Sequence, residues 1–230
     1  MHRLLYLQNS PTSESAAGVA ERLRSMEIDV TVARAYLGDL PSDSSRYDAV
    51  YVSGSPHGAY DDVSWIHREH ERIRSFARSD IPMLGVCFGS QILASALCGR
   101  DQVFRRETCE VGYVSLTLTS AATEDALMRG ILGAVRMFVW HNDEVRAGHA
   151  DMRILASSDE CPNHIWRFRD MPIWGIQGHP EVAHDASTAW LELNRPALER
   201  DGADVDALVR DRGADPEVDV LISNFIAAIN

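Results

Sequence analysis

The fold is decided by the stretch PMLGVCFGSQ, which spans residues 82–91. Its apolar run reaches Cys87, the chain turns at a glycine, and residues 91–97 have the pattern of a helix. This is the layout of a nucleophile elbow, in which a reactive side chain sits on a tight turn between a strand and a helix. The first free N–H groups of that helix favour a thiolate on Cys87, and the small residues Gly85 and Gly89 let the backbone turn without a side-chain clash.

A second stretch, GIQGHPE at residues 175–181, offers a base and a group that orients it. A catalytic cysteine needs a histidine to take its proton and later to protonate the leaving amine, and His179 fits this role. Glu181 lies two residues further on and can fix the tautomer of the imidazole. The run PIWGI at 172–176 indicates a strand before His179, and the carboxyl ends of parallel strands converge on one crevice. We therefore expect these side chains to meet Cys87.

A third stretch, VYVSGSPHG at residues 50–58, reads as an apolar strand that ends in a glycine-containing loop. Such a loop can present backbone N–H groups to an oxyanion that develops during acyl transfer. The second donor would be the N–H of Phe88, the residue after the nucleophile.

Four blocks together carry a resemblance to a known family: SGSP at 53–56, GVCFGSQ at 85–91, HNDEV at 141–145 and QGHPE at 177–181. In this order they resemble the signature blocks of class I (triad) glutamine amidotransferase domains. The chain is most similar to stand-alone members that resemble the amidotransferase half of GMP synthase, a group that includes γ-glutamyl peptidases. The resemblance spans roughly residues 1 to 190.

The resemblance implies a three-layer α/β fold of the flavodoxin-like type, with a mostly parallel central sheet flanked by helices. We expect a single domain over residues 1–230, with its core at 1–190 and a helical C-terminal extension at 191–230.

By position, the resemblance assigns Cys87 to attack on the γ-carboxamide carbon of glutamine or of another γ-glutamyl amide. It assigns His179 to acid–base catalysis and Glu181 to the orientation of His179. The oxyanion hole is implied to be backbone from three residues: Gly54, Ser55 and Phe88. Contacts to the amino-acid end of the substrate, partly through backbone, are implied for Gln91, Trp140, His141 and Asn142.

Two positions depart from many relatives. Ser90 stands where many have a histidine, and Gly54-Ser55-Pro56 stands where many have Gly-Gly-Pro. These departures leave the triad intact and bear on how the substrate fits near the start of the helix.

The composition agrees with a soluble enzyme of 230 residues, 45% of them hydrophobic. A net charge of −12 argues against binding to nucleic acid or to an anionic membrane surface. All 22 basic residues are arginine, which excludes a Schiff-base lysine, a Ser-Lys dyad and a P-loop lysine. Because no glycine-rich phosphate loop is present either, we expect neither an ATP-dependent synthetase activity on this chain nor a cofactor.

The first nine residues hold too short an apolar run for a secretory signal, and no run approaches the ~18 apolar residues of a membrane span. A cytoplasmic protein is therefore expected. The cysteines show no metal-type spacing and should be free thiols, with only the first in a reactive setting: Cys87, Cys98, Cys109 and Cys161.

Two groups of residues could suggest a metal. His67, His70 and Glu71 share one helical face, but their charged neighbours favour a solvated face of ion pairs. The run HNDE at 141–144 is contiguous, so its side chains should point in different directions, and we expect a substrate-binding turn instead. No metal site is therefore predicted.

The pattern of apolar residues predicts the elements that carry these motifs. Strands are expected at 4–7, 28–33, 48–53, 81–86, 110–119, 134–140, 153–157, 164–168 and 173–177. Helices are expected at 12–26 (capped by Thr12 or Ser13), 63–78, 91–97 and 123–129. From residue 187 onward the pattern predicts three more helical segments: one that begins at 187, one at 205–209 and one at 218–229. The C-terminal helices either cover the sheet or form a surface for a partner.

Three functions remain open from the sequence. The chain could supply ammonia from glutamine to a separate synthetase, or act alone as a hydrolase of γ-glutamyl peptides or γ-glutamyl amines. The third, a silent binding module, is disfavoured by the intact cysteine, histidine and glutamate. The leaving amine and the oligomeric state, a homodimer included, stay open.

Overall fold

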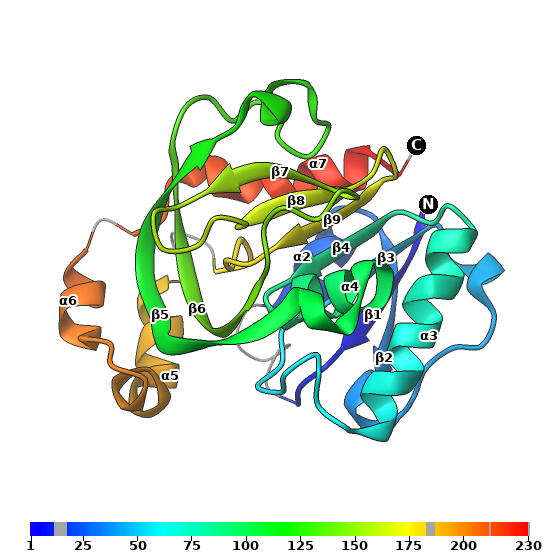
Figure 1. The fold of residues 1–230 in the computed structure, drawn as a ribbon, viewed down its shortest axis with the longest axis horizontal. Helices are drawn as coiled ribbons and strands as arrows, with labels where there is room; N and C mark the ends of the chain where they lie inside the picture. Colours follow the sequence, from blue (N-terminus) through cyan, green and yellow to red (C-terminus); the bar gives the residue numbers. More distant parts are fainter. Residues whose placement is uncertain (12–17, 183–186, 212, 230) are drawn as a thin grey trace.

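The computed structural model describes residues 1–11, 18–182, 187–211 and 213–229 (Figure 1). Within these residues one nine-stranded sheet has the order β2-β1-β3-β4-β9-β8-β7-β5-β6. Its strands are β1 (Arg3–Gln8), β2 (Asp29–Arg34), β3 (Ala49–Val52), β4 (Met83–Val86), β5 (Val103–Leu118), β6 (Val135–Val145), β7 (Met152–Ser157), β8 (Ile165–Phe168) and β9 (Ile173–Ile176). The α-helices are α2 (Val19–Ser25), α3 (Ser64–Arg78), α4 (Phe88–Cys98), α5 (Ser187–Arg200), α6 (Val205–Arg210) and α7 (Val220–Ala227). Short 3₁₀ turns are η1 (Ala35–Leu37), η2 (Ser44–Arg46), η3 (Arg100–Gln102), η4 (Ser120–Glu124) and η6 (Pro216–Asp219).

One half of the sheet is parallel and buried on both faces. Strands β2, β1, β3, β4 and β9 pair in parallel. Successive side chains of a strand point to opposite faces, so in β1 Leu4 and Tyr6 enter one core cluster while Leu5 and Leu7 enter the other. Helices α2 and α7 cover the first face, and α3 and α4 cover the second (Figure 1). The expected three-layer α/β fold is thereby confirmed.

The other half of the sheet is antiparallel and curls away from the parallel half (Figure 1). Its longest pair is β5 with β6, and both strands run beyond their predicted limits. The predicted turn at 141–144 is wrong, because these residues form the end of β6. They are polar, yet they pair with β5: Arg105 lies opposite Asp143, and Phe104 lies opposite Glu144. Cross-strand partners of this kind hold charged residues in a strand.

The predicted helix at 123–129 is also wrong. The chain makes only the 3₁₀ turn η4, and Asp125 then adopts an extended backbone conformation. Its buried carboxylate accepts hydrogen bonds from the indole N–H of Trp174 at 3.0 Å and from the N–H of Leu127 at 2.9 Å, and it pairs with Arg167 at 3.2 Å. These partners fix the side chain in a position that ends the turn.

The other predicted helices lie close to their expected limits. Residues 12–17, with the predicted cap at Thr12 or Ser13, lie outside the described residues, and α2 begins at Val19. The last predicted helix divides into η6 and α7, and α7 packs Leu221, Ile222 and Phe225 into the core. In the described part of the chain no helix has the length and apolarity that a bilayer crossing requires.

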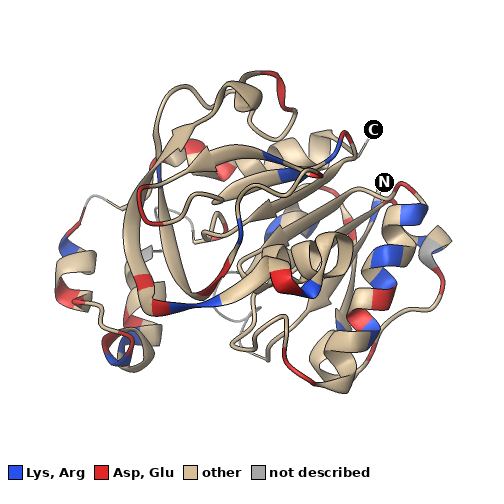
Figure 2. Ribbon diagram, viewed as in Figure 1, with Lys and Arg blue, Asp and Glu red and all other residues tan. Residues whose placement is uncertain are grey.

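Charged residues gather on α3, α5 and α6 (Figure 2). The charged face predicted for α3 is only partly right. His67 does pair with Asp62 at 2.7 Å, and Glu71 is exposed. Glu69 and His70, however, are buried at 0% and 3% exposure, and Glu69 contacts Asn9 just beyond the end of β1.

Candidate active site

The elbow forms where it was expected, between β4 and α4. Cys87 has φ 55° and ψ −113°, a conformation that non-glycine residues rarely adopt and that points to a functional constraint. As expected, Gly85 and Gly89 avoid a side-chain clash at the turn, although neither has a positive φ. A Cβ on Gly89 would lie 2.0 Å from the carbonyl oxygen of Val52, and one on Gly85 would lie 2.3 Å from the carbonyl oxygen of Gly89. Glycine is therefore required for close packing of the helix on the sheet.

The loop after β3 lies directly beside Cys87. A Cβ placed on Gly54 would be 3.7 Å from the Cβ of Cys87 and 4.0 Å from Cε1 of His179. Phe88 begins α4, and the first N–H groups of a helix have no partner within the helix. Both segments that were predicted to supply oxyanion donors therefore adjoin the thiol.

His179 and Glu181 form a partly buried pair after β9. His179 Nδ1 lies 2.8 Å from Glu181 Oε1, and each side chain is 11% exposed. Burial alone would lower the pKa of His179, but the negative charges of Glu181 and Cys87 outweigh burial and hold this pKa well above its usual value. The protonated imidazole is therefore the favoured state of His179.

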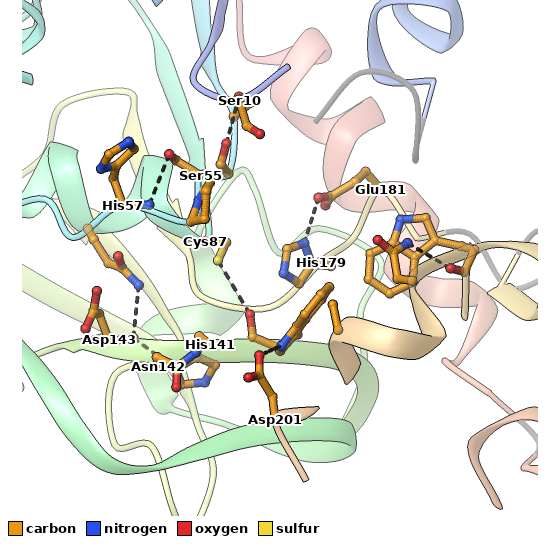
Figure 3. A pocket seen from close by; sticks show the side chains of 18 of the residues that line it. Ser10, Ser55, His57, Cys87, His141, Asn142, Asp143, His179, Glu181 and Asp201 are labelled. Atoms are coloured by element: carbon orange, nitrogen blue, oxygen red, sulfur yellow. Dashed lines mark hydrogen bonds and ion pairs between the residues drawn. The ribbon is translucent and has the colours of Figure 1, made fainter. Parts of the chain in front are cut away.

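The thiol and the imidazole lie next to each other with Glu181 beyond them (Figure 3). In its thiol form Cys87 Sγ donates to the backbone carbonyl of Trp140 at 3.8 Å, and His179 Nε2 is buried with no hydrogen-bond partner among the described residues. The ring centroids of Phe138 and Trp190 lie 6.2 and 6.3 Å from the centroid of the His179 ring. Because Nε2 of His179 has no hydrogen-bond partner among the described residues, it can exchange a proton with a group that enters the pocket.

All three residues of the predicted triad line one pocket of about 570 Å³. Its wall contains the 53–57 loop, the Trp140–Asp143 part of β6, and helix α5. Along α5 and just beyond its end, four pocket residues share one helical face: Trp190, Asn194, Ala197 and Asp201.

The predicted substrate contacts lie at the pocket, but several are already engaged. The Gln91 amide nitrogen donates to the Asp143 carbonyl at 2.9 Å and to Gln177 Oε1 at 3.3 Å. Trp140 donates its indole N–H to Asp201 at 2.9 Å, which ties β6 to the end of α5. Asn142 is half-buried and lines the pocket.

The imidazole of His141 has no exposed surface and pairs with Glu110, on β5. Its Nδ1 lies 3.0 Å from the carbonyl oxygen of Asp143. Its side chain therefore supports the pocket wall from behind. Ser90, in contrast, does not line the pocket: its hydroxyl accepts a hydrogen bond from Trp166 Nε1 at 2.9 Å inside the core.

Polar residues to which the sequence pattern assigned no role also line the pocket, among them Arg105 on β5 and Arg200 on α5. On one side Asp143 accepts a hydrogen bond from the Tyr60 hydroxyl at 2.8 Å and pairs with Arg105 at 3.7 Å. Burial raises the pKa of Asp143, and burial together with the Asp143 carboxylate raises the pKa of Tyr60 to about 12. On the other side stand Arg200 and Asp201. The only sequence signal for this wall was the spacing 190, 194, 197 and 201.

All four cysteines are free thiols, as expected. Burial raises the pKa of Cys98 to about 12, that of Cys109 to about 11 and that of Cys161 further still. A raised pKa leaves little thiolate at neutral pH, so these three positions lack the setting of a nucleophile.

The profile of the family "Glutamine amidotransferase class-I" matches residues 14–194. The chain belongs to this family. Among curated relatives, the glutamine-hydrolyzing GMP synthase of Porphyromonas gingivalis is 30% identical over 174 residues, which are 75% of this chain and 32% of that protein. One subunit of the glutamine-hydrolyzing GMP synthase of Sulfolobus acidocaldarius is 31% identical over 139 residues, 60% of this chain and 70% of that relative.

The matched part of the chain thus spans about a third of the first of these relatives. Solved structures agree in fold over nearly the whole chain. A glutamine amidotransferase from Thermotoga maritima has a TM-score of 0.84 at 21% identity and covers 99% of this chain and 97% of its own. A glutamine amido transferase from Methylobacillus flagellatus has a TM-score of 0.79 at 22% identity, with 100% and 94% covered.

Proposed function

We propose that this class I amidotransferase hydrolyses the amide bond of a γ-glutamyl compound through a covalent thioester on Cys87. The observation that carries the proposal is the strained elbow conformation of Cys87 beside a partly buried histidine–glutamate pair. Family membership supports the same chemistry, and each of the four sequence blocks that resemble the family contributes residues to the pocket.

In the first half of the reaction, the Cys87 thiolate adds to the carbonyl carbon of the γ-amide. The negative charge that develops on the carbonyl oxygen is held by backbone N–H groups of Ser55 and Phe88, and each such donor typically stabilises the transition state by ~3 to 4 kcal/mol. The C–N bond then breaks. His179 gives the proton on Nε2 to the departing amine, so the amine leaves neutral and a γ-glutamyl thioester remains.

In the second half, a water molecule occupies the place of the amine. His179, now neutral, takes a proton from the water as the oxygen adds to the thioester carbon. The C–S bond breaks, glutamate leaves, and the thiolate–imidazolium pair is restored. Glu181 keeps the proton on Nδ1 throughout and stabilises the imidazolium, as the third member of a triad does.

The size and the charges of the α5 side of the pocket favour hydrolysis without a synthetase. The pocket volume of about 570 Å³ falls in the range of about 300 to 1,000 Å³ typical of drug-sized ligands, and glutamine is much smaller than these. Arg200 and Asp201 stand on the α5 side and offer charges of both signs to a group beyond the amide nitrogen. A self-sufficient hydrolase of γ-glutamyl peptides or γ-glutamyl amines would use this space.

The second candidate function is delivery of ammonia to a separate synthetase. The relatives named as one subunit of GMP synthase support it, because this name describes part of a larger enzyme. In that case the chain would release glutamate from glutamine and would need its partner for full activity.

The test is glutamate release by the purified full chain from glutamine, γ-glutamyl dipeptides and γ-glutamyl diamines, with Cys87→Ala as the blank. Rapid release from one γ-glutamyl compound and slow release from glutamine would identify a dedicated hydrolase. Release only from glutamine, or only after a synthetase is added, would identify a protein that supplies ammonia. Turnover by Cys87→Ala at the wild-type rate would overturn the proposal.

A matched pair of variants locates the leaving-group side. Asp201→Asn should lower kcat/KM for γ-glutamyl diamines more than for glutamine, and Arg200→Ala should do so for γ-glutamyl dipeptides. If each variant lowers kcat/KM equally for all substrates, the α5 side of the pocket does not select the leaving amine.

A further inference from the structure

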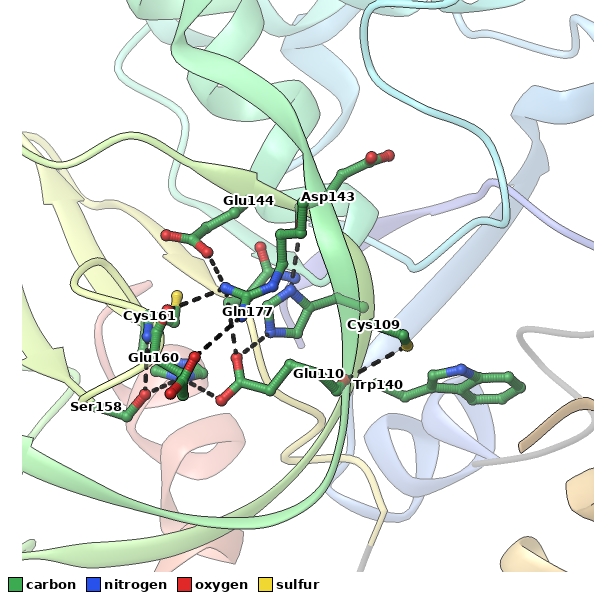
Figure 4. Close-up of polar contacts among 12 residues, drawn as sticks. Cys109, Glu110, Trp140, Asp143, Glu144, Ser158, Glu160, Cys161 and Gln177 are labelled. Carbon is green, nitrogen blue, oxygen red and sulfur yellow. Dashed lines mark hydrogen bonds and ion pairs between the residues drawn. The ribbon is translucent and has the colours of Figure 1, made fainter. Parts of the chain in front are cut away.

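A second group of chemically active side chains lies behind the pocket wall. It consists of Glu110, His141, Cys161 and His164, all of them buried. Each offers one ligand atom, and these atoms all lie within 4.8 Å of one another. Three separate segments bring them together: β5, β6, and the loop between β7 and β8 (Figure 4). Glu110 and His141 are direct cross-strand partners, beside the β-bulge of β5.

The hydrogen bonds of His141 orient its ring for a ligand. Its Nδ1 lies 3.0 Å from the backbone carbonyl of Asp143, and a carbonyl oxygen only accepts, so Nδ1 carries the proton. Nε2 then presents its lone pair toward Glu110. A histidine whose other nitrogen donates to a backbone carbonyl is the usual arrangement around a protein-bound metal.

Several atoms of the group are buried without a satisfying partner. Both carboxylate oxygens of Glu110, Nε2 of His141 and Nδ1 of His164 make no hydrogen bond to any described residue. Both imidazoles face this carboxylate: Glu110 Oε2 lies 2.9 Å from His141 Nε2, and Glu110 Oε1 lies 3.9 Å from His164 Nε2. Buried polar atoms in this condition are uncommon, and an ion that accepts their lone pairs explains them.

The surrounding charges can balance a divalent cation. Arg106 lies next to the group, 3.9 Å from Glu110 Oε2, and its guanidinium is paired with Glu144. With that pair neutral, the carboxylate of Glu110 and a thiolate on Cys161 supply the two negative charges that a divalent ion needs. The thiol proton would be released to solvent on binding, with no change of oxidation state.

We propose that Glu110, His141, Cys161 and His164 bind a divalent transition metal of the zinc type. One sulfur, two nitrogens and one oxygen form a donor set that zinc accepts in tetrahedral geometry. Around such an ion these ligand atoms would lie about 3.3 to 3.6 Å apart, so separations of up to 4.8 Å would have to close by about 1 to 1.5 Å. The ion ties the 158–164 loop to the β5–β6 pair behind Trp140 and Asp143. It has a structural role and takes no part in the amide hydrolysis.

The experiment uses the full chain without a polyhistidine tag. The protein is loaded with Zn²⁺ or Co²⁺, passed over a chelating resin, and analysed for metal by mass spectrometry. We expect about one ion per chain and, for Co²⁺, a thiolate-to-cobalt charge-transfer band. Zinc at 100 times its dissociation constant should raise Tm by roughly 5 to 10 °C.

Variants separate this site from the catalytic cysteine, which could also bind metal. The cobalt band should persist in Cys87→Ser and in Cys98→Ser and disappear in Cys161→Ser. If Cys161→Ser folds poorly, His164→Gln serves instead and should also lose the ion. A chain that retains no metal, or a band lost in Cys87→Ser and kept in Cys161→Ser, overturns the proposal. If the chain retains no metal, Glu110 and His141 share a proton in its place.

Discussion

Two sets of cysteine, histidine and glutamate occur among the described residues. They share residue types but differ in backbone conformation, in exposure to a pocket and in their neighbours. In the first, Cys87 is held at positive φ at the head of α4, faces the pocket and lies beside the His179–Glu181 pair. In the second, Cys161 is buried beside Glu110, His141 and His164, and burial raises the pKa of its thiol.

The comparison teaches that the composition of a cluster does not decide its chemistry. A nucleophile needs free N–H groups for the oxyanion, an opening for the substrate and a histidine with one nitrogen to spare. The Cys87 set lines a pocket of about 570 Å³, whereas the Cys161 set is buried and its four ligand atoms lie within 4.8 Å of one another.

The largest expected effect comes from exchanging the two cysteines for alanine one at a time. Cys87→Ala should reduce kcat/KM for glutamate release by at least about 10³-fold, because no other group can form the thioester. Cys161→Ala should change kcat less than about tenfold. Steady-state assays on the two variants and the wild type, with folding checked by circular dichroism, give the comparison. Similar losses of kcat/KM in both variants would contradict the distinction between the two sets.

The next effect concerns the two glutamates. Glu181→Gln should lower kcat by about 10²- to 10⁴-fold, since the imidazole loses the group that fixes its tautomer. The carboxylate also raises the pKa of His179, and acylation needs a protonated His179, so activity falls as pH rises through that pKa. Removing the charge should move this alkaline limb of the pH profile of kcat/KM to lower pH. Glu110→Gln should leave the alkaline limb of the kcat/KM profile at its wild-type pH. A shift of this limb in both variants would contradict the roles given to the two glutamates.

A smaller effect tests how the elbow of the first set is packed. Gly89→Ala should destabilise the fold by about 2 to 3 kcal/mol, because its Cβ would meet the backbone carbonyl of Val52 at 2.0 Å. Gly54→Ala is the matched control, since its Cβ meets only ordinary contacts at 3.7 Å or more. Thermal unfolding of both variants measures the difference. Equal Tm values would show that the helix can move away from the sheet at little cost.

The last effect concerns the pH dependence of stability and comes from Glu69, a buried glutamate with no histidine or arginine partner among its described contacts. Glu69 accepts a hydrogen bond from Asn9 Nδ2 at 3.1 Å, and burial raises its pKa to about 8. The unfolded carboxyl ionises near 4.5 while the folded one stays protonated, so stability falls as pH rises between these values. The loss is at most about 1.4 kcal/mol per pH unit.

Glu69→Gln removes this dependence, and its Tm advantage over the wild type should grow from about pH 5 to about pH 8. The neighbouring His70, whose pKa burial lowers to about 4, is present in both proteins and cancels in the difference. Calorimetry across this range decides the point. A difference that stays constant with pH would mean that Glu69 is ionised in the folded protein.

The first set could be predicted from sequence because its parts are local. An apolar strand, a cysteine and a glycine in the order of residues 84–89 fix the elbow, and His179 and Glu181 are two residues apart. The structure brings them together because the parallel strands β4 and β9 are neighbours and end at the same edge of the sheet.

The second set could not be predicted in the same way. Its residues come from three segments, and the polar run at 141–144 has the composition of a turn although it pairs with β5. Helix α5 was predicted as a helix, and the spacing of residues 190, 194, 197 and 201 places them on one face, but that spacing does not show that the face lines the pocket. Long-range pairing of strands and the docking of a terminal helix are set by tertiary contacts, which local patterns do not report.

The most direct test of the central claim is covalent labelling with a glutamine analogue that carries a diazoketone in place of the amide. The labelled protein is digested and its peptides are identified by mass spectrometry, while residual glutamate release is followed in parallel. The account predicts one label per chain, on Cys87 alone, with activity lost in proportion to labelling. A label on Cys161 or another residue, or full activity after complete labelling of Cys87, would contradict it.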